Sequence, residues 1–216
     1  MKKIILIGGG GHCKVVIDTI LSTNEFEIIG ILDLEENVGK EVLGVPVIAT
    51  DTQLEDYFRK GIRFCFITVG SIGTKAFLRE NLFMRAQKIG FRFPNIIHPG
   101  SVVSKFTIIG EGNYVAPGTI INAGTIIGNH CILNTGSKID HDCNIGNFVH
   151  VAPGVTISGG VEIGDYSHIG TGSSIIQCLK IGSNTIIGAG SVVLSDIPDN
   201  VVAFGNPCKI RRKNNG

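Results

Sequence analysis

Residues 139–169 read IDHDCNIGNFVHVAPGVTISGGVEIGDYSHI, with an aliphatic side chain at every sixth position of the stretch. The same spacing continues in both directions and runs unbroken from Ile97 to Val193. A period of six fits neither an α-helix nor a half-buried strand. It is typical of a parallel β-helix, in which each six-residue unit forms one face of a triangular coil. The alternative, an antiparallel sandwich with evenly spaced turns, does not explain so regular a phase.

The composition describes a folded protein large enough for two small domains. The chain has 216 residues, 43% hydrophobic and 17% charged, with a net charge of +1. This charge gives no electrostatic reason to expect nucleic acid or a membrane surface as a partner. The N-terminus, MKKIILIGGGG, has too short an apolar part for a signal peptide. The six cysteines show no CxxC spacing, so we expect reduced thiols, a cytoplasmic protein and no bound metal.

Three segments with different patterns are expected. They are an α/β domain (1–94), the β-helix (95–198) and a basic, polar tail (199–216). In the first, predicted strands occupy 3–7, 27–32, 45–48 and 63–69, and predicted helices occupy 12–21, 52–59 and 75–88. Because strands alternate with helices, we expect a parallel sheet of the Rossmann-like, half-domain type.

Four glycines, Gly8 to Gly11, separate the first predicted strand from the first predicted helix. Such a turn can hold a phosphate on the helix N-terminus through free backbone N–H groups. Asp33 ends the second strand, where an acid can bind a ribose hydroxyl. The short domain favours a nucleotide such as UDP over a dinucleotide; the alternative is a tight turn that binds nothing. Cys13 replaces the last glycine of the usual motif, and it is either a reactive thiol or a packing residue.

One histidine of the repeat has acids on both sides, since His141 stands between Asp140 and Asp142. A carboxylate can orient an imidazole and raise its basicity, as a general base requires. Adjacent side chains on a straight strand point to opposite sides, so a turn is needed before either acid can meet the ring. His150 and His168 are 18 residues apart and should stack one coil above the other. His98 and His130 lack acidic neighbours, and we expect them to be structural or at the surface.

The hexad array resembles the left-handed β-helix acyltransferases. The segments GGGGH, ILD and ITVG of the first domain resemble the sugar-modifying branch of that group, and the string NTGSKIDHDCNIGNFVHVAPG (134–154) is the most specific element. The branch includes the UDP-4-amino-sugar N-acetyltransferases of the bacillosamine pathway and the sialic acid O-acetyltransferases. The resemblance implies a left-handed coil, acetyl-CoA as co-substrate, a role in bacterial glycan biosynthesis and a homotrimer with active sites between subunits.

The same resemblance assigns roles to individual residues. It implies that His141 is the catalytic base and Asp142 the acid that raises its basicity. The residues implied to bind acetyl-CoA are Asn134, His150, Gly159, Thr171, Gly188 and Lys209. The residues implied to bind the nucleotide-sugar are Gly11, His12, Cys13, Asp33 and Gly70. Leu34 stands where the bacillosamine-type enzymes have a second Asp, which leaves the nucleotide and the sugar open.

The predicted function is direct transfer of an acetyl group from acetyl-CoA to an amino group on a UDP-linked 4-amino-sugar, with His141 as the general base. One alternative is O-acetylation of sialic acid or a related sugar, which would use the same fold, donor and base. Another, from a different class, is a non-catalytic nucleotide-sugar-binding protein. Loss of the histidine would favour this non-catalytic alternative, but His141 is present.

Overall fold

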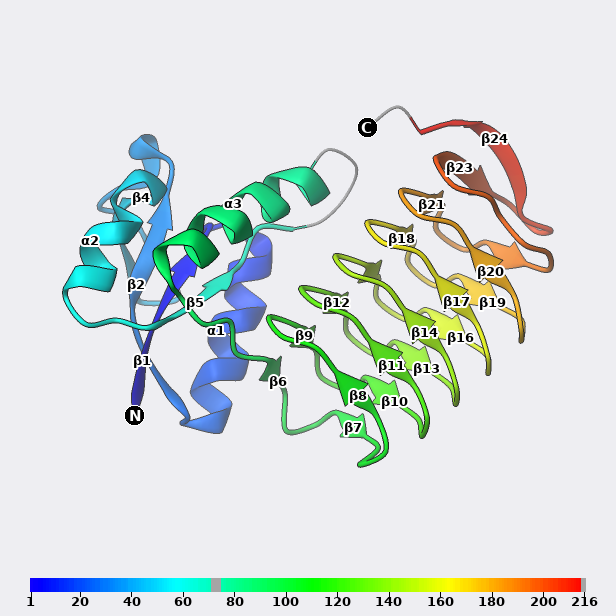
Figure 1. The fold of residues 1–216 in the computed structure, drawn as a ribbon, viewed down its shortest axis with the longest axis horizontal. Helices are drawn as coiled ribbons and strands as arrows, with labels where there is room; N and C mark the ends of the chain where they lie inside the picture. The colour runs from blue at the N-terminus through cyan, green and yellow to red at the C-terminus, as the bar shows by residue number, and fades with distance from the viewer. Residues whose placement is uncertain (71–74, 215–216) are drawn as a thin grey trace.

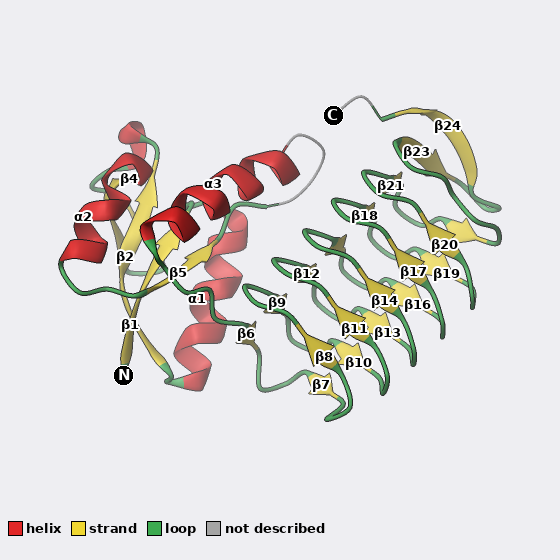
Figure 2. Ribbon diagram, viewed as in Figure 1, coloured by secondary structure: helices red, strands yellow, loops and turns green. Residues whose placement is uncertain are grey.

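The computed structural model describes residues 1–70 and 75–214, which form an α/β region followed by a solenoid (Figures 1 and 2). The α/β region contains β1 (Lys2–Ile7), α1 (Gly11–Thr23), β2 (Phe26–Asp33), β3 (Glu41–Val42), β4 (Val45–Thr50), α2 (Leu54–Arg59), β5 (Phe64–Ile67) and α3 (Lys75–Ile89). Short 3-10 helices cover Glu35–Asn37 and Asp51–Gln53. None of these helices, nor any other in the described ranges, has the length and apolar character that a membrane span needs.

The sheet of this region has the order β3-β4-β2-β1-β5. All its pairs are parallel except the short β3–β4 hairpin. The apolar positions of α1 cover one side of the sheet, and those of α2 and α3 cover the other, so both faces are buried. Continuous apolar runs such as Ile4–Ile7 are therefore fully enclosed, as expected of a parallel sheet between two helical layers.

The solenoid is a triangular coil of two-residue strands with three faces. Face 1 contains β6 (Ile96–Ile97), β9 (Tyr114–Val115), β12 (Ile132–Leu133), β15 (His150–Val151), β18 (His168–Ile169) and β21 (Ile186–Ile187). Face 2 contains β7 (Val102–Val103), β10 (Ile120–Ile121), β13 (Lys138–Ile139), β16 (Thr156–Ile157), β19 (Ser174–Ile175) and β22 (Val192–Val193). Face 3 contains β8 (Ile108–Ile109), β11 (Ile126–Ile127), β14 (Asn144–Ile145), β17 (Glu162–Ile163) and β20 (Lys180–Ile181).

The six-residue repeat explains the interior of the coil. Each aliphatic residue pairs in parallel register with the one 18 residues later, as Ile145 does with Ile163. From Val115 to Val193 these side chains are at most 3% exposed. Serine or threonine stands two positions before many of these aliphatic residues, and from Thr119 onward these small side chains are buried at the corners. The hydroxyl of Thr125, for example, donates to the carbonyl of Asp140 at 2.7 Å. The predicted parallel β-helix is therefore confirmed, coil by coil.

The described part of the tail, residues 199–214, has a regular structure of its own. It forms an antiparallel hairpin of β23 (Val201–Phe204) and β24 (Lys209–Lys213), which extends face 1. The reason is that Val201, Val202 and Ala203 are buried at the open end of the coil. This hairpin protects the last complete strand of face 1 from being an unpaired edge.

The α/β region packs on face 1 of the solenoid through α1. Val16, Ile17 and Ile20 share one apolar cluster with Tyr114 and Ile132 of that face. The Tyr114 hydroxyl donates to the carbonyl of Val15 at 3.1 Å. Because buried apolar contacts and a hydrogen bond join the two regions, the side of the coil that faces the α/β region is fixed.

Candidate active site

His141 lies on the turn between face 2 and face 3, directly after β13. Asp142 has a left-handed backbone, with φ of 58°. This conformation turns the carboxylate back, so that Oδ2 of Asp142 lies 2.8 Å from Nδ1 of His141. Asp140 has a different task, because its Oδ1 accepts hydrogen bonds from the His141 N–H and from Nδ2 of Asn122, both at 2.8 Å. Asp142 is therefore the acid that faces the ring, and Asp140 holds the turn.

The charges of this turn raise the pKa of His141 above its ordinary value of 6.5. The hydrogen bond to Asp142 is the larger cause, and the charge of Asp140 adds to it. The pKa of Asp140 is lowered, first by the hydrogen bond from Asn122. A carboxylate can only accept, so Nδ1 of a neutral His141 carries the hydrogen and Nε2 is left as an acceptor. The side chain is 62% exposed, so the imidazole as a whole is accessible from solvent.

A hollow of about 450 Å³ lies beside His141 and is lined by Asp140, His141, Asp142, Ser158, Gly159, Gly160, Gln177 and Cys178. Gly159 has a specific reason to be glycine. A Cβ placed there would lie 2.6 Å from Nε2 and Cε1 of the His141 ring, so any side chain would displace the ring from this position. The structure therefore brings His141, Asp142 and Gly159 together, whereas the resemblance placed Gly159 with the residues that bind acetyl-CoA.

Asn134 and His150 lie elsewhere on the coil, at face 1 and the turn that follows it. Nδ2 of Asn134 is 3.3 Å from Nε2 of His150. His150 is 8% exposed, and its ring meets that of His168 edge to face at 4.8 Å, so the expected stacking is found. The remaining residues predicted to bind acetyl-CoA continue along the same side of the coil and the hairpin beyond it: Thr171, Gly188 and Lys209. Within one chain, this row does not meet His141.

The glycine turn opens into a second hollow, of about 500 Å³, at the carboxyl ends of β1, β2 and β5. Four of the residues predicted to bind the nucleotide-sugar line it: Gly11, His12, Asp33 and Gly70. Leu78 and Leu82 of α3 close one side. In parallel α/β sheets, ligands bind at this end of the strands, where a helix N-terminus offers N–H groups.

Asp33 braces the glycine turn as well as lining the hollow. Its Oδ2 accepts from the Gly9 N–H and from Nδ2 of Asn37, both at 3.1 Å, and its Oδ1 accepts from the Leu34 N–H at 2.9 Å. Gly8 must be glycine, because its φ is 106° and a Cβ would lie 2.7 Å from Cγ2 of Val69. The carboxylate thus fixes the loop shape and places a negative charge at the rim. Sequence reasoning missed Asn37, which shares this rim.

Cys13 and His12 behave differently although they are neighbours. The Cys13 side chain is fully buried below the turn, outside the lining of the hollow, and its N–H donates to the carbonyl of Gly10 at 3.0 Å. Burial raises the pKa of its thiol to about 11. The placement favours a packing role for the Cys13 side chain and disfavours a reactive thiolate, while contact of Cys13 with a ligand through its backbone stays a prediction. His12 does line the hollow, and burial, helped by Arg79, lowers its pKa to about 3, so it is neutral.

The two candidate centres lie on opposite sides of one chain. The nucleotide hollow belongs to the α/β region, which packs on face 1. His141 stands at the corner between face 2 and face 3, which is the corner opposite face 1. Within one chain, the glycine hollow and the hollow beside His141 share none of their lining residues.

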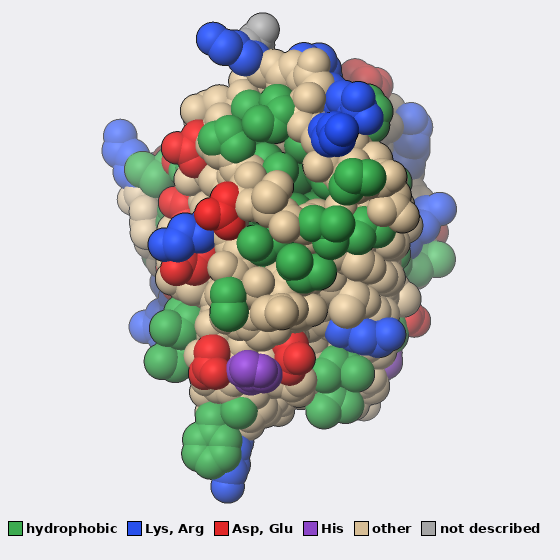
Figure 3. Space-filling view, turned by 90° about the vertical axis from the view of Figure 1, so that its right-hand side faces the viewer, with side chains coloured by type: hydrophobic (Ala, Val, Ile, Leu, Met, Phe, Trp, Pro, Cys, Tyr) green, Lys and Arg blue, Asp and Glu red, His purple; other side chains and the backbone are tan. Residues whose placement is uncertain are grey.

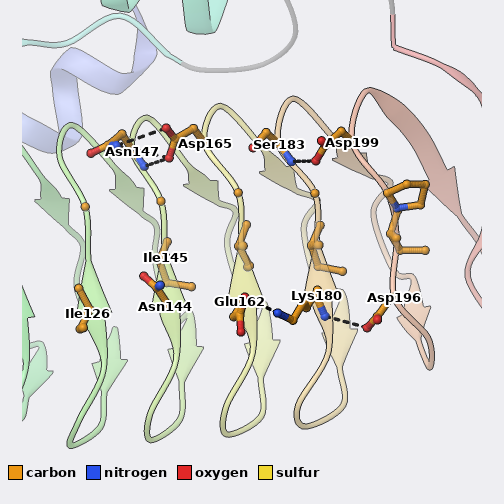
Figure 4. Close-up of a pocket in the computed structure, with 18 residues that line it drawn as sticks. Ile126, Asn144, Ile145, Asn147, Glu162, Asp165, Lys180, Ser183, Asp196 and Asp199 are labelled. Carbon is orange, nitrogen blue, oxygen red and sulfur yellow. Dashed lines mark hydrogen bonds and ion pairs between the residues drawn. The ribbon is translucent and has the colours of Figure 1, made fainter.

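A third hollow, of about 890 Å³, runs along face 3 (Figure 4). Figure 4 shows its charged groups engaged with one another or with the backbone. Nζ of Lys180 is 3.1 Å from Oε2 of Glu162, and Oδ1 of Asp165 accepts from the Asn147 N–H at 2.7 Å. No histidine or cysteine lines it. We interpret the charged groups that line this hollow as structural contacts between successive coils. Across residues 1–70 and 75–214, no cluster of three or more His, Cys, Asp or Glu could hold a metal ion.

Comparisons with known proteins agree with both halves of the fold. Residues 3–85 match the PglD N-terminal domain, and residues 142–177 and 160–195 match the bacterial transferase hexapeptide repeats. The chain is 37% identical over 119 residues to UDP-N-acetylbacillosamine N-acetyltransferase of Bacillus subtilis (strain 168). That match covers 53% of this chain and 51% of the relative, so it spans about half the length of that protein.

Solved structures are similar over nearly the whole chain. One is a histidine-to-asparagine variant of perosamine N-acetyltransferase from Caulobacter crescentus, in complex with CoA and GDP-perosamine, with a TM-score of 0.92 and 39% identity over 98% of this chain and 97% of that one. Another is the acetyltransferase domain of PglB from Neisseria gonorrhoeae FA1090 in complex with acetyl coenzyme A, with a TM-score of 0.89 and 35% identity over 97% and 99%. The predicted fold class, an α/β domain before a left-handed β-helix, is confirmed.

Proposed function

Because this chain belongs to the hexapeptide-repeat sugar N-acetyltransferases that carry a PglD-type N-terminal domain, we propose that it transfers the acetyl group of acetyl-CoA to an amino group of a nucleotide-linked sugar. The predicted class and co-substrate are confirmed at the level of the family, whose solved members bind CoA or acetyl-CoA. The observation that carries the proposal for this chain is the 2.8 Å contact between His141 and Asp142 beside an open hollow.

The proposed reaction needs a base, a donor and an oxyanion site. The amine nitrogen attacks the thioester carbonyl carbon while Nε2 of His141 takes the amine proton. The carbon–sulfur bond then breaks, the nitrogen keeps the acetyl group, and the sulfur leaves as CoA, which is protonated to the thiol. Asp142 stabilises the imidazolium that forms, because it lies on Nδ1 at 2.8 Å. Backbone N–H groups near the hollow are the proposed donors to the oxyanion.

The donor site is proposed along the turns that follow face 1. Asn134 and His150 would meet acetyl-CoA there, with Thr171 and Gly188 further along and Lys209 on the hairpin. A cation such as Lys209 suits the phosphates of CoA, and this side chain is exposed. Gly159 would act through His141, because its missing side chain makes room for the ring.

The acceptor site is proposed at the glycine hollow, with Gly11, His12, Asp33 and Gly70 on the nucleotide. The relatives named above use different nucleotides, since one name contains UDP and another protein is complexed with GDP-perosamine. We retain a nucleotide-linked 4-amino-sugar as the acceptor, and the choice between UDP and GDP is decided by the assay below. All six cysteines are free, which supports the cytoplasmic location that we propose.

We further propose that the working unit is a homotrimer in which one chain's nucleotide hollow serves the His141 of a neighbour. Apolar side chains crowd the corner of His141 itself: Phe106, Ile176 and Leu194 are 66%, 37% and 50% exposed on that same corner. Figure 3, which views the side that lies to the right in Figure 1, shows hydrophobic side chains gathered in the middle of that face. Exposed apolar patches of this kind mark protein interfaces.

The proposal is tested by the release of CoA thiol with a panel of UDP-, GDP- and dTDP-linked amino sugars and free sialic acids. We expect release with a nucleotide-linked amino sugar only. Release with sialic acid alone would favour O-acetylation. If acetyl-CoA fails to bind by calorimetry at millimolar concentration, the protein is not an acetyl-CoA-dependent enzyme and the non-catalytic alternative holds.

A further inference from the structure

The corner between face 3 and face 1 has an unusual set of residues in the left-handed conformation. His130, Phe148 and Tyr166 have φ values of 56°, 55° and 61°. At the corner between face 1 and face 2, the equivalent positions are all glycine: 118, 136, 154, 172 and 190. A bulky residue in this conformation costs about 1–2 kcal/mol. Three such residues in successive coils therefore need a compensating contact.

The compensating contact is α3, which lies along this corner (Figure 1). The rings of His130, Phe148 and Tyr166 stack in a column, with centroid distances of 5.2 and 5.4 Å. Two side chains of α3 join this column, since Phe77 stacks on Tyr166 at 5.7 Å and Phe83 meets His130 at 4.2 Å. The Tyr166 hydroxyl also donates to Oε1 of Glu80 on α3 at 2.8 Å. The helix is thus clamped to three coils of the solenoid.

Arg79 lies at the centre of this seam and is 1% exposed. Its Nη1 donates to the carbonyls of Ile67 and Val69 at 3.1 and 2.6 Å. Its Nη2 donates to the carbonyl of His130 on the solenoid at 3.0 Å. Val69 lines the nucleotide hollow, as do Leu78 and Leu82 on the same helix. One guanidinium therefore joins the rim of the hollow to a turn of the solenoid.

Stability alone does not explain a buried guanidinium at this place. Within the described ranges, no carboxylate lies within ion-pair distance of Arg79. Its Nη1 and Nη2 donate to carbonyl oxygens, and its buried Nε has no hydrogen-bond partner. Desolvation of such a group is expensive, and an apolar side chain of similar volume often serves stability equally well. What an apolar side chain cannot do is fix three separate carbonyls in one geometry, because this requires the rigid fork of arginine.

We propose that Arg79 is a positioning residue that fixes the rim of the nucleotide hollow to the solenoid turn at His130 and so sets the direction in which the bound sugar points. This inference rests on the proposed function. The hollow has to present its sugar to a histidine held on another part of the assembly. A misplacement of about 1 Å far from the reacting atoms can cost about 100-fold in rate. Arg79 would act on the acceptor alone, because it contacts the acceptor hollow and not the turns proposed for acetyl-CoA.

The test compares Arg79→Lys and Arg79→Met with Arg85→Lys, a matched control. Arg85 is on the same helix but is 41% exposed, with Asp51 at 3.5 Å. We expect both Arg79 variants to lower kcat/KM for the nucleotide-linked amino sugar by about 10- to 100-fold. The KM for acetyl-CoA should stay within about twofold of the wild type, and Arg85→Lys should leave both values unchanged. If Arg79→Met fails to fold, the test rests on Arg79→Lys, which keeps the charge.

A second measurement needs no substrate. Hydrogen exchange of Arg79→Lys should be faster at the amides of Thr68 and His130, which lie beside the bonded carbonyls, and unchanged at Gly170, about two coils away. Equal losses for both substrates, or unchanged exchange at Thr68 and His130, would overturn the positioning role. If the wild-type protein transfers no acetyl group, the proposed function is wrong. The exchange experiment would still test whether Arg79 holds the rim of the hollow to the solenoid.

Discussion

A single left-handed residue brings two neighbours in sequence, the proposed base and its acid, into a hydrogen-bonded pair. His141 and Asp142 would point apart on a straight strand, and the φ of 58° at Asp142 brings Oδ2 to 2.8 Å from Nδ1. If this pair supplies the base, His141→Ala should lower kcat by about 10²- to 10⁴-fold, because that is what a general base contributes. Steady-state kinetics at saturating acetyl-CoA measures the effect. His98→Ala, a histidine without acidic neighbours, is the control and should keep wild-type kcat.

The pH dependence of kcat follows from the same contact. A base works in its neutral form, so the rate should rise as pH climbs through the pKa of His141. The carboxylates raise this pKa, so the rising limb should be centred above 6.5. Asp142→Asn removes the larger cause and should move the limb to lower pH while reducing the plateau. A limb that stays in place in Asp142→Asn, or persists in His141→Ala, would assign the base to another residue.

Asp33 has two tasks that a pair of variants can separate. Asp33→Asn keeps an oxygen for the Gly9 N–H or the Leu34 N–H but removes the charge at the rim of the hollow. We expect it to raise the KM for the nucleotide-sugar about 10- to 100-fold, the usual value of a hydrogen bond to a charged group, with the KM for acetyl-CoA unchanged. Asp33→Ala should also lower the melting temperature, because the glycine turn loses its brace. Equal effects of Asp33→Asn on both KM values would mean that Asp33 only supports the fold. The control is Asp56→Asn, at an exposed position on α2.

At the scale of the elements, the coil depends on its aliphatic ladder more than on any single strand. Ile163 is 3% exposed between Ile145 and Ile181, with which it pairs in register. Ile163→Ala should lower the free energy of unfolding by about 2–5 kcal/mol, because the neighbours cannot collapse into the space. Leu21→Ala, at a site 59% exposed on α1, should change it by less than about 0.5 kcal/mol. Denaturant unfolding at one fixed protein concentration compares them.

The strands and helices also show which parts of the fold could be predicted from the sequence. The six-residue repeat predicts the strands of the coil for two reasons. The periodicity is local in sequence, and each strand pairs with the equivalent strand 18 residues away. The predicted strand 63–69 is wrong at its end: β5 stops at Ile67, and Arg79 binds the Val69 carbonyl instead. Contacts between distant segments, such as Arg79 with His130, leave no local signal. One signal was readable, since the rings of His130, Phe148 and Tyr166 recur every 18 residues.

At the scale of the whole molecule, the chain separates its two candidate centres. Face 1 carries the α/β region with its nucleotide hollow, and the opposite corner carries His141 with exposed Phe106, Ile176 and Leu194 beside it. The contacts of α3 with the solenoid fix the position of the nucleotide hollow relative to the coil. We therefore propose that a second copy supplies one of the two halves, and closed cyclic symmetry would repeat that contact around a ring.

Mixed assemblies test this arrangement directly. His141→Ala has an intact nucleotide hollow and no base, and Asp33→Ala has an intact base and a damaged hollow, so each alone should be nearly inactive with the nucleotide-sugar. If the site combines the hollow of one chain with the histidine of the next, random co-assembly in equal amounts should restore about one quarter of wild-type activity, the fraction of contacts that unite two intact halves. Unfolding the two variants together and refolding them allows the exchange, and mixing them without unfolding is the control. Activity that stays at the level of the separate variants after verified co-assembly would place the complete site within one chain.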